Sequence, residues 1–263
     1  MNIGRIQALL MRHMYLYQRS LARLLEIVYW PFVDLVVWGF ITIYLAKEGK
    51  SLHGAVAFFL GALILWDVLF RAQQGIALSF LEEMWARNLM NLFASPLTVG
   101  EYLAATMVLS ILKVTVVSIL MIIFAYLFYS YNVFIMGFYL LPFILNLILF
   151  GWSIGVLTTS IIMRFGQQAE VLAWGMVFLF QPISCVFYPV DVLPGLLQNI
   201  AWMVPPAHIF EGMRMVILDG SPPTEHLLWA TVLNFGYLAL AVKWFYYTFE
   251  VCKEQGLLVR VGE

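Results

Sequence analysis

Long apolar runs alternate with short polar breaks along the whole chain. A helix that crosses the hydrocarbon core of a bilayer needs about 20 mostly apolar residues. The runs that meet this requirement are 28–46, 55–79, 101–128, 135–161, 170–188 and 226–247. Residues 114–163 contain no Asp, Glu, Lys or Arg, and the polar break at 129–132 predicts the turn between two spans. The pattern therefore predicts an all-α integral membrane protein with six transmembrane helices, in which residues 1–263 form a single transmembrane domain.

Composition supports this prediction and argues against other classes. Hydrophobic residues make up 63% of the chain and charged residues 11%, whereas soluble domains carry about 25% charged residues. The net charge of −1 argues against a nucleic-acid binder. Cys185 and Cys252 lie in an apolar segment and in the tail, so we expect two unpaired thiols.

Lysine and arginine predict the orientation, because they are enriched on the cytoplasmic side of membrane proteins. With the N-terminus inside, the inner segments hold nine of these residues and the outer segments hold three. Lys113 and Lys243 are left out because they fall within predicted spans. We therefore expect a multi-pass protein of the cell (cytoplasmic or inner) membrane with both termini in the cytoplasm.

The first 27 residues predict an amphipathic helix at the membrane surface. Apolar residues recur every three or four positions and form one stripe, while four arginines lie on nearly the opposite face. Such a helix lies in the membrane interface and favours anionic lipid headgroups. Two roles remain open, a basic anchor alone or an anchor that also contacts a cytoplasmic partner. The stripe consists of Ile3, Ile6, Leu10, Met14, Tyr17, Leu21 and Leu24, and the arginines are Arg5, Arg12, Arg19 and Arg23.

Residues 80–98 separate the second and third runs and predict a short amphipathic helix on the cytoplasmic side. Glu83 and Arg87 are four residues apart with the acid first, which favours a helical ion pair worth about 0.2–0.5 kcal/mol. Pro96 is expected to end the helix, because the residue before a proline avoids the α region. Thr98 and Glu101 match a capping box for the third span. The alternative is a plain surface loop.

Residues 181–217 are apolar but contain too many prolines for one long helix. They predict two short helices, at about 194–203 and 207–218, joined by a Pro-Pro break. Non-helical backbone at membrane depth is tolerated only where protein or a water-filled cavity covers it. We therefore expect residues 189–225, here called the outer segment, to enter the membrane from outside as a gate. The alternative is a loop that lies flat on the membrane.

Charged residues inside predicted spans are rare and usually face the protein interior. Asp34, Asp67 and Lys113 lie within spans, and Arg71 lies near the inner part of the second span. We expect Asp67 to pair with Arg71, four residues on, and Lys113 to meet Asp34 or Asp67. Two roles remain open, which are paired charges that lock helix packing and a substrate path or proton relay.

Two motifs together resemble the membrane (permease) subunits of type-2 ABC exporters, a family that moves polysaccharides, lipids and drugs. The stretch "LEEMWARNLMNLFASPLTVGEYL" (81–103) resembles the family's first cytoplasmic loop, and "FYPVDVLPGLLQNIAWMVPPAHIFEGMR" (187–214) resembles its outer helices. The resemblance implies that the first motif is a coupling helix that docks on an ATPase subunit, through Glu82, Glu83, Arg87, Ser95 and Pro96. It implies that the second motif forms an outer gate, with Pro189, Pro194, Pro205, His208, Glu211 and Arg214.

The chain itself is not expected to be an enzyme. A phosphate-binding loop needs a glycine five residues before Gly-Lys-Ser or Gly-Lys-Thr, and Tyr44 occupies that position before Gly49-Lys50-Ser51. No metal motif is evident, and His208 with Glu211 would supply only two ligands. The resemblance implies no cofactor in this chain, with ATP and magnesium bound by two copies of a separate cytoplasmic ATPase. It also implies that the permease works as a homodimer in contact with membrane lipids.

The expected function is therefore the transmembrane subunit of an ATP-driven exporter. The compact chain and its aromatic content of 16% favour an amphipathic or glycan-type substrate, with drugs or lipids as the alternative. A different class, an ion-coupled secondary transporter, would use Asp34, Asp67 and Lys113. Its usual signature of interrupted spans in matching halves is not evident. A third class, a membrane-embedded enzyme, is disfavoured because the sequence shows no catalytic constellation.

Overall fold

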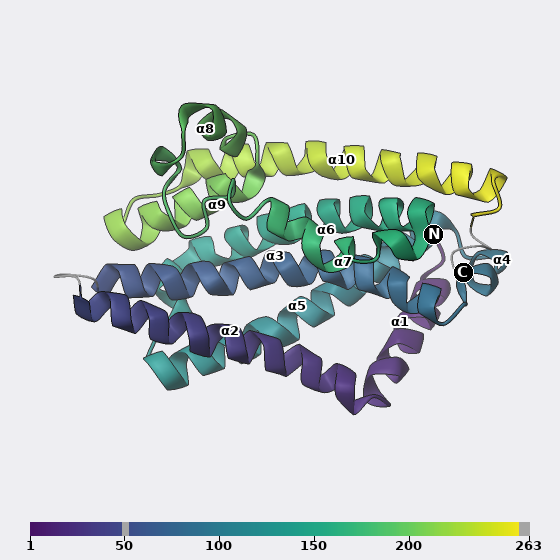
Figure 1. Cartoon of the computed structure of the whole chain (residues 1–263), viewed down its shortest axis with the longest axis horizontal. Coiled ribbons are helices and arrows are strands. Elements are labelled where there is room, and N and C mark those ends of the chain that lie inside the picture. Colours follow the sequence, from purple (N-terminus) through teal and green to yellow (C-terminus); the bar gives the residue numbers. More distant parts are fainter. Residues whose placement is uncertain (49–52, 258–263) are drawn as a thin grey trace.

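A computed structural model describes residues 1–48 and 53–257, which form an elongated bundle of long helices (Figure 1). No β-strand occurs within these residues, which confirms the all-α prediction. The long helices are α2 (Leu21–Glu48), α3 (His53–Trp85), α5 (Val99–Tyr129), α6 (Leu140–Phe165) and α10 (Thr224–Glu254).

Three helical stretches among the described residues are long and apolar enough to cross a membrane, namely Val99–Tyr129, Val133–Ala169 and Thr224–Glu254. The second of these joins the 3-10 turns η1 (Val133–Tyr139) and η2 (Gly166–Ala169) to α6. The apolar part of α2, Val28–Tyr44, is shorter. The number of six spans therefore stays a prediction.

Helix α3 lies at the centre of the bundle, between α5 and α6 (Figure 1). Small residues allow these helices to approach closely. A Cβ atom on Gly151 of α6 would lie 2.6 Å from the Cβ of Ala72, and one on Gly155 would lie 2.8 Å from the carbonyl oxygen of Gln73. A Cβ on Gly75 of α3 would lie 2.6 Å from the Cα of Ser110 in α5. Helix α3 is therefore held on two sides at almost backbone-to-backbone distance.

The predicted fifth span, 170–188, is not one regular helix, so the expected helix is wrong here, whereas a crossing of the membrane by this segment stays a prediction. The chain instead forms short pieces, with α7 (Leu172–Gly175) and η3 (Met176–Leu179) joined by turns. Pro182 has no N–H to donate to a helix, and Gly175 disfavours one. The carbonyl oxygen of Ala173 instead accepts a hydrogen bond from Nε2 of Gln73 in α3, at 3.2 Å. A side chain of the neighbouring helix thus satisfies a carbonyl group of the broken segment.

One end of the bundle, here called the α4 end, collects α1 (Ile3–Gln18), α4 (Leu89–Ala94) and the last turns of α3 and α10 (Figure 1). The amphipathic N-terminal helix ends at Gln18, so that residues 21–27 already belong to α2. Residues 80–85 likewise continue α3, and only 89–94 form a separate short helix.

At the opposite end, here called the α8 end, the outer segment folds back over the bundle (Figure 1). It holds the 3-10 turn η4 (Val190–Val192), α8 (Gly195–Ala201) and α9 (Pro205–Arg214), and a π-helical turn, η5 (Met215–Asp219), extends α9. Two short helices are thus present as predicted, but the break lies before Pro205 and the Pro-Pro pair belongs to the first turn of α9. Pro205 starts α9, where its missing N–H costs no hydrogen bond.

Candidate functional site at the α4 end

The last turn of α3 ends in a Schellman motif, which explains where the predicted helix over 80–98 is interrupted. Arg87 adopts a left-handed conformation, with a φ of 50°. Its N–H donates to the carbonyl of Met84, and the N–H of Asn88 donates to the carbonyl of Glu83. This is the hydrogen-bond pattern that closes many helices, although glycine is the usual residue at the left-handed position. The chain therefore turns sharply at Arg87 before α4 begins.

Glu83 does not form the predicted ion pair with Arg87, so that prediction is wrong. Its side chain is fully buried and accepts two hydrogen bonds from Arg12 of α1, at 2.8 and 2.9 Å. Asn88 Nδ2 donates to the same carboxylate at 2.6 Å. The turn at Arg87 carries that side chain to the exposed surface, away from the interior that encloses Glu83.

Glu82 is also turned toward α1 rather than toward the surface of the loop. His13 Nδ1 lies 3.3 Å from its carboxylate, Tyr17 Oη donates at 3.3 Å, and Arg23 Nε lies 3.9 Å away. Burial raises the pKa of Glu82, but the hydrogen bond from His13 and the electrostatic attraction of Lys113, His13 and Arg23 together lower it below its usual value. Glu82 is therefore held as a carboxylate.

The arginines of α1 thus meet acidic side chains of the protein, and their predicted attraction to lipid headgroups stays a prediction. Arg5 lies 3.4 Å from Glu101 and donates to the carbonyl oxygen of Pro96 at 2.5 Å. Glu101 and Thr98 form the predicted capping box at the start of α5. A buried carboxylate needs a charged or hydrogen-bonded partner far more than an exposed headgroup does, which explains the direction of this basic face.

The turn before α5 follows the prediction, because α4 ends at Ala94 and Ser95 adopts an extended conformation before Pro96. Ser95 Oγ donates to the carbonyl oxygen of Leu92 at 2.6 Å and accepts from the N–H of Leu97 at 3.3 Å. The apolar side of the segment is buried, and it consists of Phe80, Met84, Leu89 and Leu92. The opposite side is exposed, and it consists of Trp85, Ala86, Arg87, Met90, Asn91, Ala94, Ser95 and Pro96. We call these eight exposed residues the α4 face.

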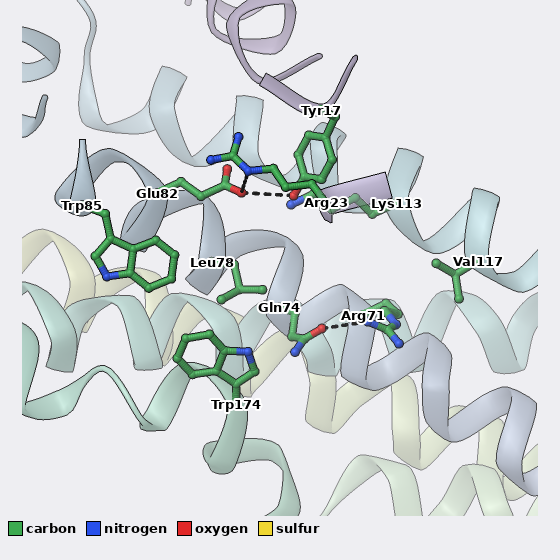
Figure 2. A pocket seen from close by; sticks show the side chains of 10 residues that line it. All are labelled: Tyr17, Arg23, Arg71, Gln74, Leu78, Glu82, Trp85, Lys113, Val117 and Trp174. Carbon is green, nitrogen blue, oxygen red and sulfur yellow. Dashed lines mark hydrogen bonds and ion pairs between the residues drawn. The ribbon is translucent and has the colours of Figure 1, made fainter. Parts of the chain in front are cut away.

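A slot with a volume of about 120 Å³ lies beside this junction, along one face of α3 (Figure 2). Its α3 residues recur every three or four positions and therefore share one helical face. They span 15 residues, and the 14 steps between the first and the last measure about 21 Å at 1.5 Å per residue. The α3 residues are Arg71, Gln74, Leu78, Glu82 and Trp85. The other walls are formed by Tyr17 of α1, Arg23 of α2, Lys113 and Val117 of α5, and Trp174 of α7.

The predicted charges within the spans lie partly in this slot. Arg71 Nε lies 3.3 Å from Asp67, which confirms that pair, and Arg71 Nη1 donates to Gln74 at 3.2 Å. Lys113 Nζ lies 4.8 Å from the centre of the Tyr17 ring and acts on the charge of Glu82. The expected contact of Lys113 with Asp34 or Asp67 stays a prediction.

One buried arginine, Arg214, connects the outer segment at the α8 end to the residues that precede it in the chain. Arg214 Nη2 donates to the carbonyl oxygens of Cys185 and Tyr188, and Nη1 lies 3.8 Å from Glu211. Glu211 in turn accepts from the N–H of Val190 at 2.6 Å. The structure therefore brings Glu211 and Arg214 together, next to the turn that follows Pro189.

His208 has a different partner in the outer segment. Its Nε2 lies 2.9 Å from the carbonyl oxygen of Trp202, and its Nδ1 lies 3.2 Å from Nδ1 of His226 in α10. Because a carbonyl only accepts, Nε2 carries a proton, and in a neutral His208 the Nδ1 atom accepts from His226. Pro194 is the N-cap of α8, away from this pair in the chain.

Sequence reasoning missed several partners of the predicted residues, namely Arg12, His13, Trp174 and His226. For α1 the sequence did contain a signal for these partners. Arg5 and Arg12 are two helical turns apart, and they pair with Glu101 of α5 and Glu83 of α3. Their pairing depends on how three helices meet, which no single segment reveals. For Trp174 and His226 the printed sequence carries no comparable signal.

The long apolar helices, the buried charges between them and the broken segments at both ends define a polytopic helical membrane protein. The sequence model of the ABC-2 type transporter family matches residues 5–218. The chain therefore belongs to the ABC-2 type transporter family and is a membrane permease of an ABC transporter. A search of curated proteins finds no match to the sequence.

Proposed function

We propose that this chain is the membrane subunit of an ATP-driven exporter and that its ATPase docks on the α4 face. The observation that carries this proposal is the difference between the two sides of residues 80–98. One side of the segment is buried and joined to α1 by Glu82 and Glu83, while the other side is exposed. A partner that pushes on the α4 face therefore acts on α3 and α1 together.

In this proposal the α4 end faces the cytoplasm, which agrees with the excess of Lys and Arg predicted there. Two copies of the chain form a homodimer in the cell membrane, and each binds one copy of a separate ATPase that holds ATP and magnesium. Arg87 and the Ser95-Pro96 turn contact the ATPase directly. Glu82 and Glu83 act behind this surface, because their carboxylates fix α1 to α3 and transmit the movement. The substrate is an amphipathic or glycan-type molecule.

The outer segment is proposed to close the exit at the other end. Pro189, Pro194 and Pro205 set the ends of its short helical elements. Glu211, Arg214 and His208 hold these elements against one another and against α10. Such a closed unit can move as one piece when the helices below it tilt.

The test purifies the tagged chain from native membranes and measures hydrolysis of MgATP by what is bound to it. We expect a co-purified ATPase whose recovery falls at least about tenfold when Met90→Glu and Arg87→Glu place two acidic residues on the α4 face. Lys253→Glu is a matched control, because Lys253 is exposed near the end of α10 and lies outside the α4 face. Recovery of no ATPase, or equal loss in the control, would refute the proposal.

A further inference from the structure

We propose that the exposed side of α2 binds an amphipathic organic cation, a positive charge carried by an apolar body. This inference rests on the proposed function, because it names a substrate class for the exporter. Three residues carry it, and they lie four residues apart along α2: Trp30, Asp34 and Trp38. We call these three residues the α2 face.

The first argument is an exposed carboxylate at membrane depth. Asp34 lies near the middle of the apolar stretch Val28–Tyr44, and its side chain is exposed. Among the described residues, none lies within hydrogen-bond or ion-pair distance of this carboxylate. Arg71 of α3 acts on its charge, but Arg71 already pairs with Asp67 at 3.3 Å. A charge within a span is costly without a partner, and a bound cation supplies that partner.

The second argument is the pair of tryptophans that flank the carboxylate. Residues four apart on a helix share a face, so the three side chains of the α2 face follow one another at intervals of about 6 Å. Both indole rings are exposed, Trp30 at 54% and Trp38 at 40%. The face of an indole attracts organic cations, and aromatic rings around a charge are a common site for quaternary ammonium groups.

The third argument is that both rings already have aromatic neighbours. Trp38 stacks on Phe187, with ring centroids 5.3 Å apart at an angle of 15°, and Phe187 also stacks on Phe59 of α3. Trp30 meets the ring of Tyr29 edge-on at 5.3 Å. Rings that are held in place before a ligand arrives lose little conformational entropy on binding.

The fourth argument is that the α2 face has an apolar continuation. Helix α2 packs on α3 and α5 and lies at the edge of the bundle (Figure 1). Its exposed side continues past Trp38 with Val37 and Ile41, which are exposed at 48% and 41%. A ligand with its charge at Asp34 therefore meets an apolar strip for the rest of its body. This arrangement favours an amphipathic cation over a small inorganic ion.

The test measures binding to the purified permease alone, in a nonionic detergent, by isothermal titration calorimetry. The probes are tetraphenylphosphonium and tetraphenylborate, which have nearly the same size and shape and opposite charges. We expect the phosphonium cation to bind and the borate anion not to bind. Equal binding of both probes would reduce the α2 face to a general apolar contact and refute the proposal. Absence of phosphonium binding would also refute it.

Two further measurements test other occupants of the α2 face. Maltohexaose represents an uncharged glycan, because sugar rings also stack on tryptophan. Binding of maltohexaose without binding of tetraphenylphosphonium would assign the face to a glycan and overturn the proposal. Light scattering reports the oligomeric state, and conversion of a dimer to a monomer by Trp30→Leu would assign the face to a second copy of the chain instead.

Substitutions separate the α2 face from general effects of charge and aromaticity. Asp34→Asn should weaken tetraphenylphosphonium binding at least about tenfold, the effect of one lost charged partner. Trp30→Leu and Trp38→Leu should each weaken it about twofold to fivefold. Glu225→Gln and Trp229→Leu are matched controls, because this acid and this tryptophan are exposed and four residues apart on α10. Equal weakening in the control variants would contradict the site.

Asp34→Asn also separates binding from a packing role. Because Asp34 lacks a bonded partner among the described residues, its Tm in detergent should not fall. A lower Tm that accompanies weaker binding would show that Asp34 holds α2 against α3, and it would count against the proposal. Asp34→Glu keeps the charge and should bind the cation. No ATPase is present here, so failure of cation binding leaves docking at the α4 face untouched, and the reverse also holds.

Discussion

At the α4 end, polar contacts join residues that are far apart in the chain, whereas at the α8 end they join near neighbours. Arg12 and Glu83 are separated by 71 residues, and Asn2 donates to Glu101 across 99. In the outer segment, the bonds of Glu211, Arg214 and His208 span 6 to 29 residues. The first arrangement ties three helices into one junction, and the second closes a local unit. A displacement applied at the α4 end is therefore shared by several helices.

The comparison can be tested with the two cysteines, because each end contains one. Cys185 lies in the cluster under the outer segment, and Cys252 lies in the cluster at the α4 end, and both are buried. The rate of labelling of each thiol with a maleimide reports local opening of its own end. Two backgrounds, Cys252→Ser and Cys185→Ser, separate the two signals.

The largest effect is expected for Arg12→Ala. It leaves the fully buried carboxylate of Glu83 without its charged partner. Loss of one partner of a buried pair costs about 3–5 kcal/mol, and the 40% exposure of the Arg12 side chain reduces this to about 2–3 kcal/mol. Thermal unfolding in detergent should show a clearly lower Tm. Addition of Glu83→Gln should restore part of the loss, and an unchanged Tm in Arg12→Ala would contradict the junction.

Arg214→Ala is expected to destabilise the α8 end by about 2 kcal/mol, because hydrogen bonds from a buried charged group are lost. The effect should be local. Labelling of Cys185 should accelerate, since Arg214 donates to the carbonyl oxygen of that residue, while labelling of Cys252 should not change. Equal acceleration at both cysteines would show that the two ends are not independent.

Thr98→Ala removes the side-chain cap at the start of α5 and should cost about 1 kcal/mol. The reason is that the N–H of Glu101 loses its acceptor at 3.3 Å. The measurement is again the Tm, compared with that of Thr98→Ser, which keeps the hydroxyl group and should remain close to the parent value. If both variants unfold alike, the capping box contributes nothing to the junction.

The smallest effect is a pH dependence at the α8 end. Burial lowers the pKa of His208, and His226 lowers it further, although the hydrogen bond to Trp202 and the charge of Glu225 oppose this. A group whose pKa is lower in the folded state stabilises the fold above its unfolded pKa, here 6.5, and this stability is lost as the pH falls. Maleimide reacts with the thiolate, whose fraction falls with pH, so the labelling rate is divided by that of a free cysteine peptide at the same pH. This ratio should rise for Cys185 between about pH 7 and pH 5, and less so in His208→Gln.

Regular features of the fold could be predicted from local sequence, and pairings between distant segments could not. Thr98 and Glu101 are three residues apart, so their capping box is visible in the chain, and the same holds for Asp67 with Arg71. Pro205 and Pro206 likewise mark the start of the second of two short helices. Glu83 shows the opposite case. Its local neighbour Arg87 suggested an ion pair, but a turn at Arg87 separates the two side chains, and Arg12 takes that place from another helix.

The regular helix expected for the fifth span is absent for a related reason. Its composition is apolar enough for a membrane helix, but hydropathy does not report whether carbonyl groups find partners outside the helix. Gln73 supplies such a partner to Ala173, and Pro182 cannot donate a backbone hydrogen bond. The slot beside α3 could not be predicted from local sequence either. Its five α3 residues share a helical face, but two of its charged residues, Arg23 and Lys113, come from other helices.

The close contact of Gly75 with Ser110 has a mechanical consequence. Gly75 lies 10 residues from Trp85 and 22 residues from His53, which are the two ends of α3. At 1.5 Å per residue these arms are about 15 and 33 Å long. If α3 tilts as a rigid rod about this fulcrum, a shift of about 1 Å at the short arm becomes about 2 Å at the long arm. The position of a single glycine thus sets the lever ratio of the central helix.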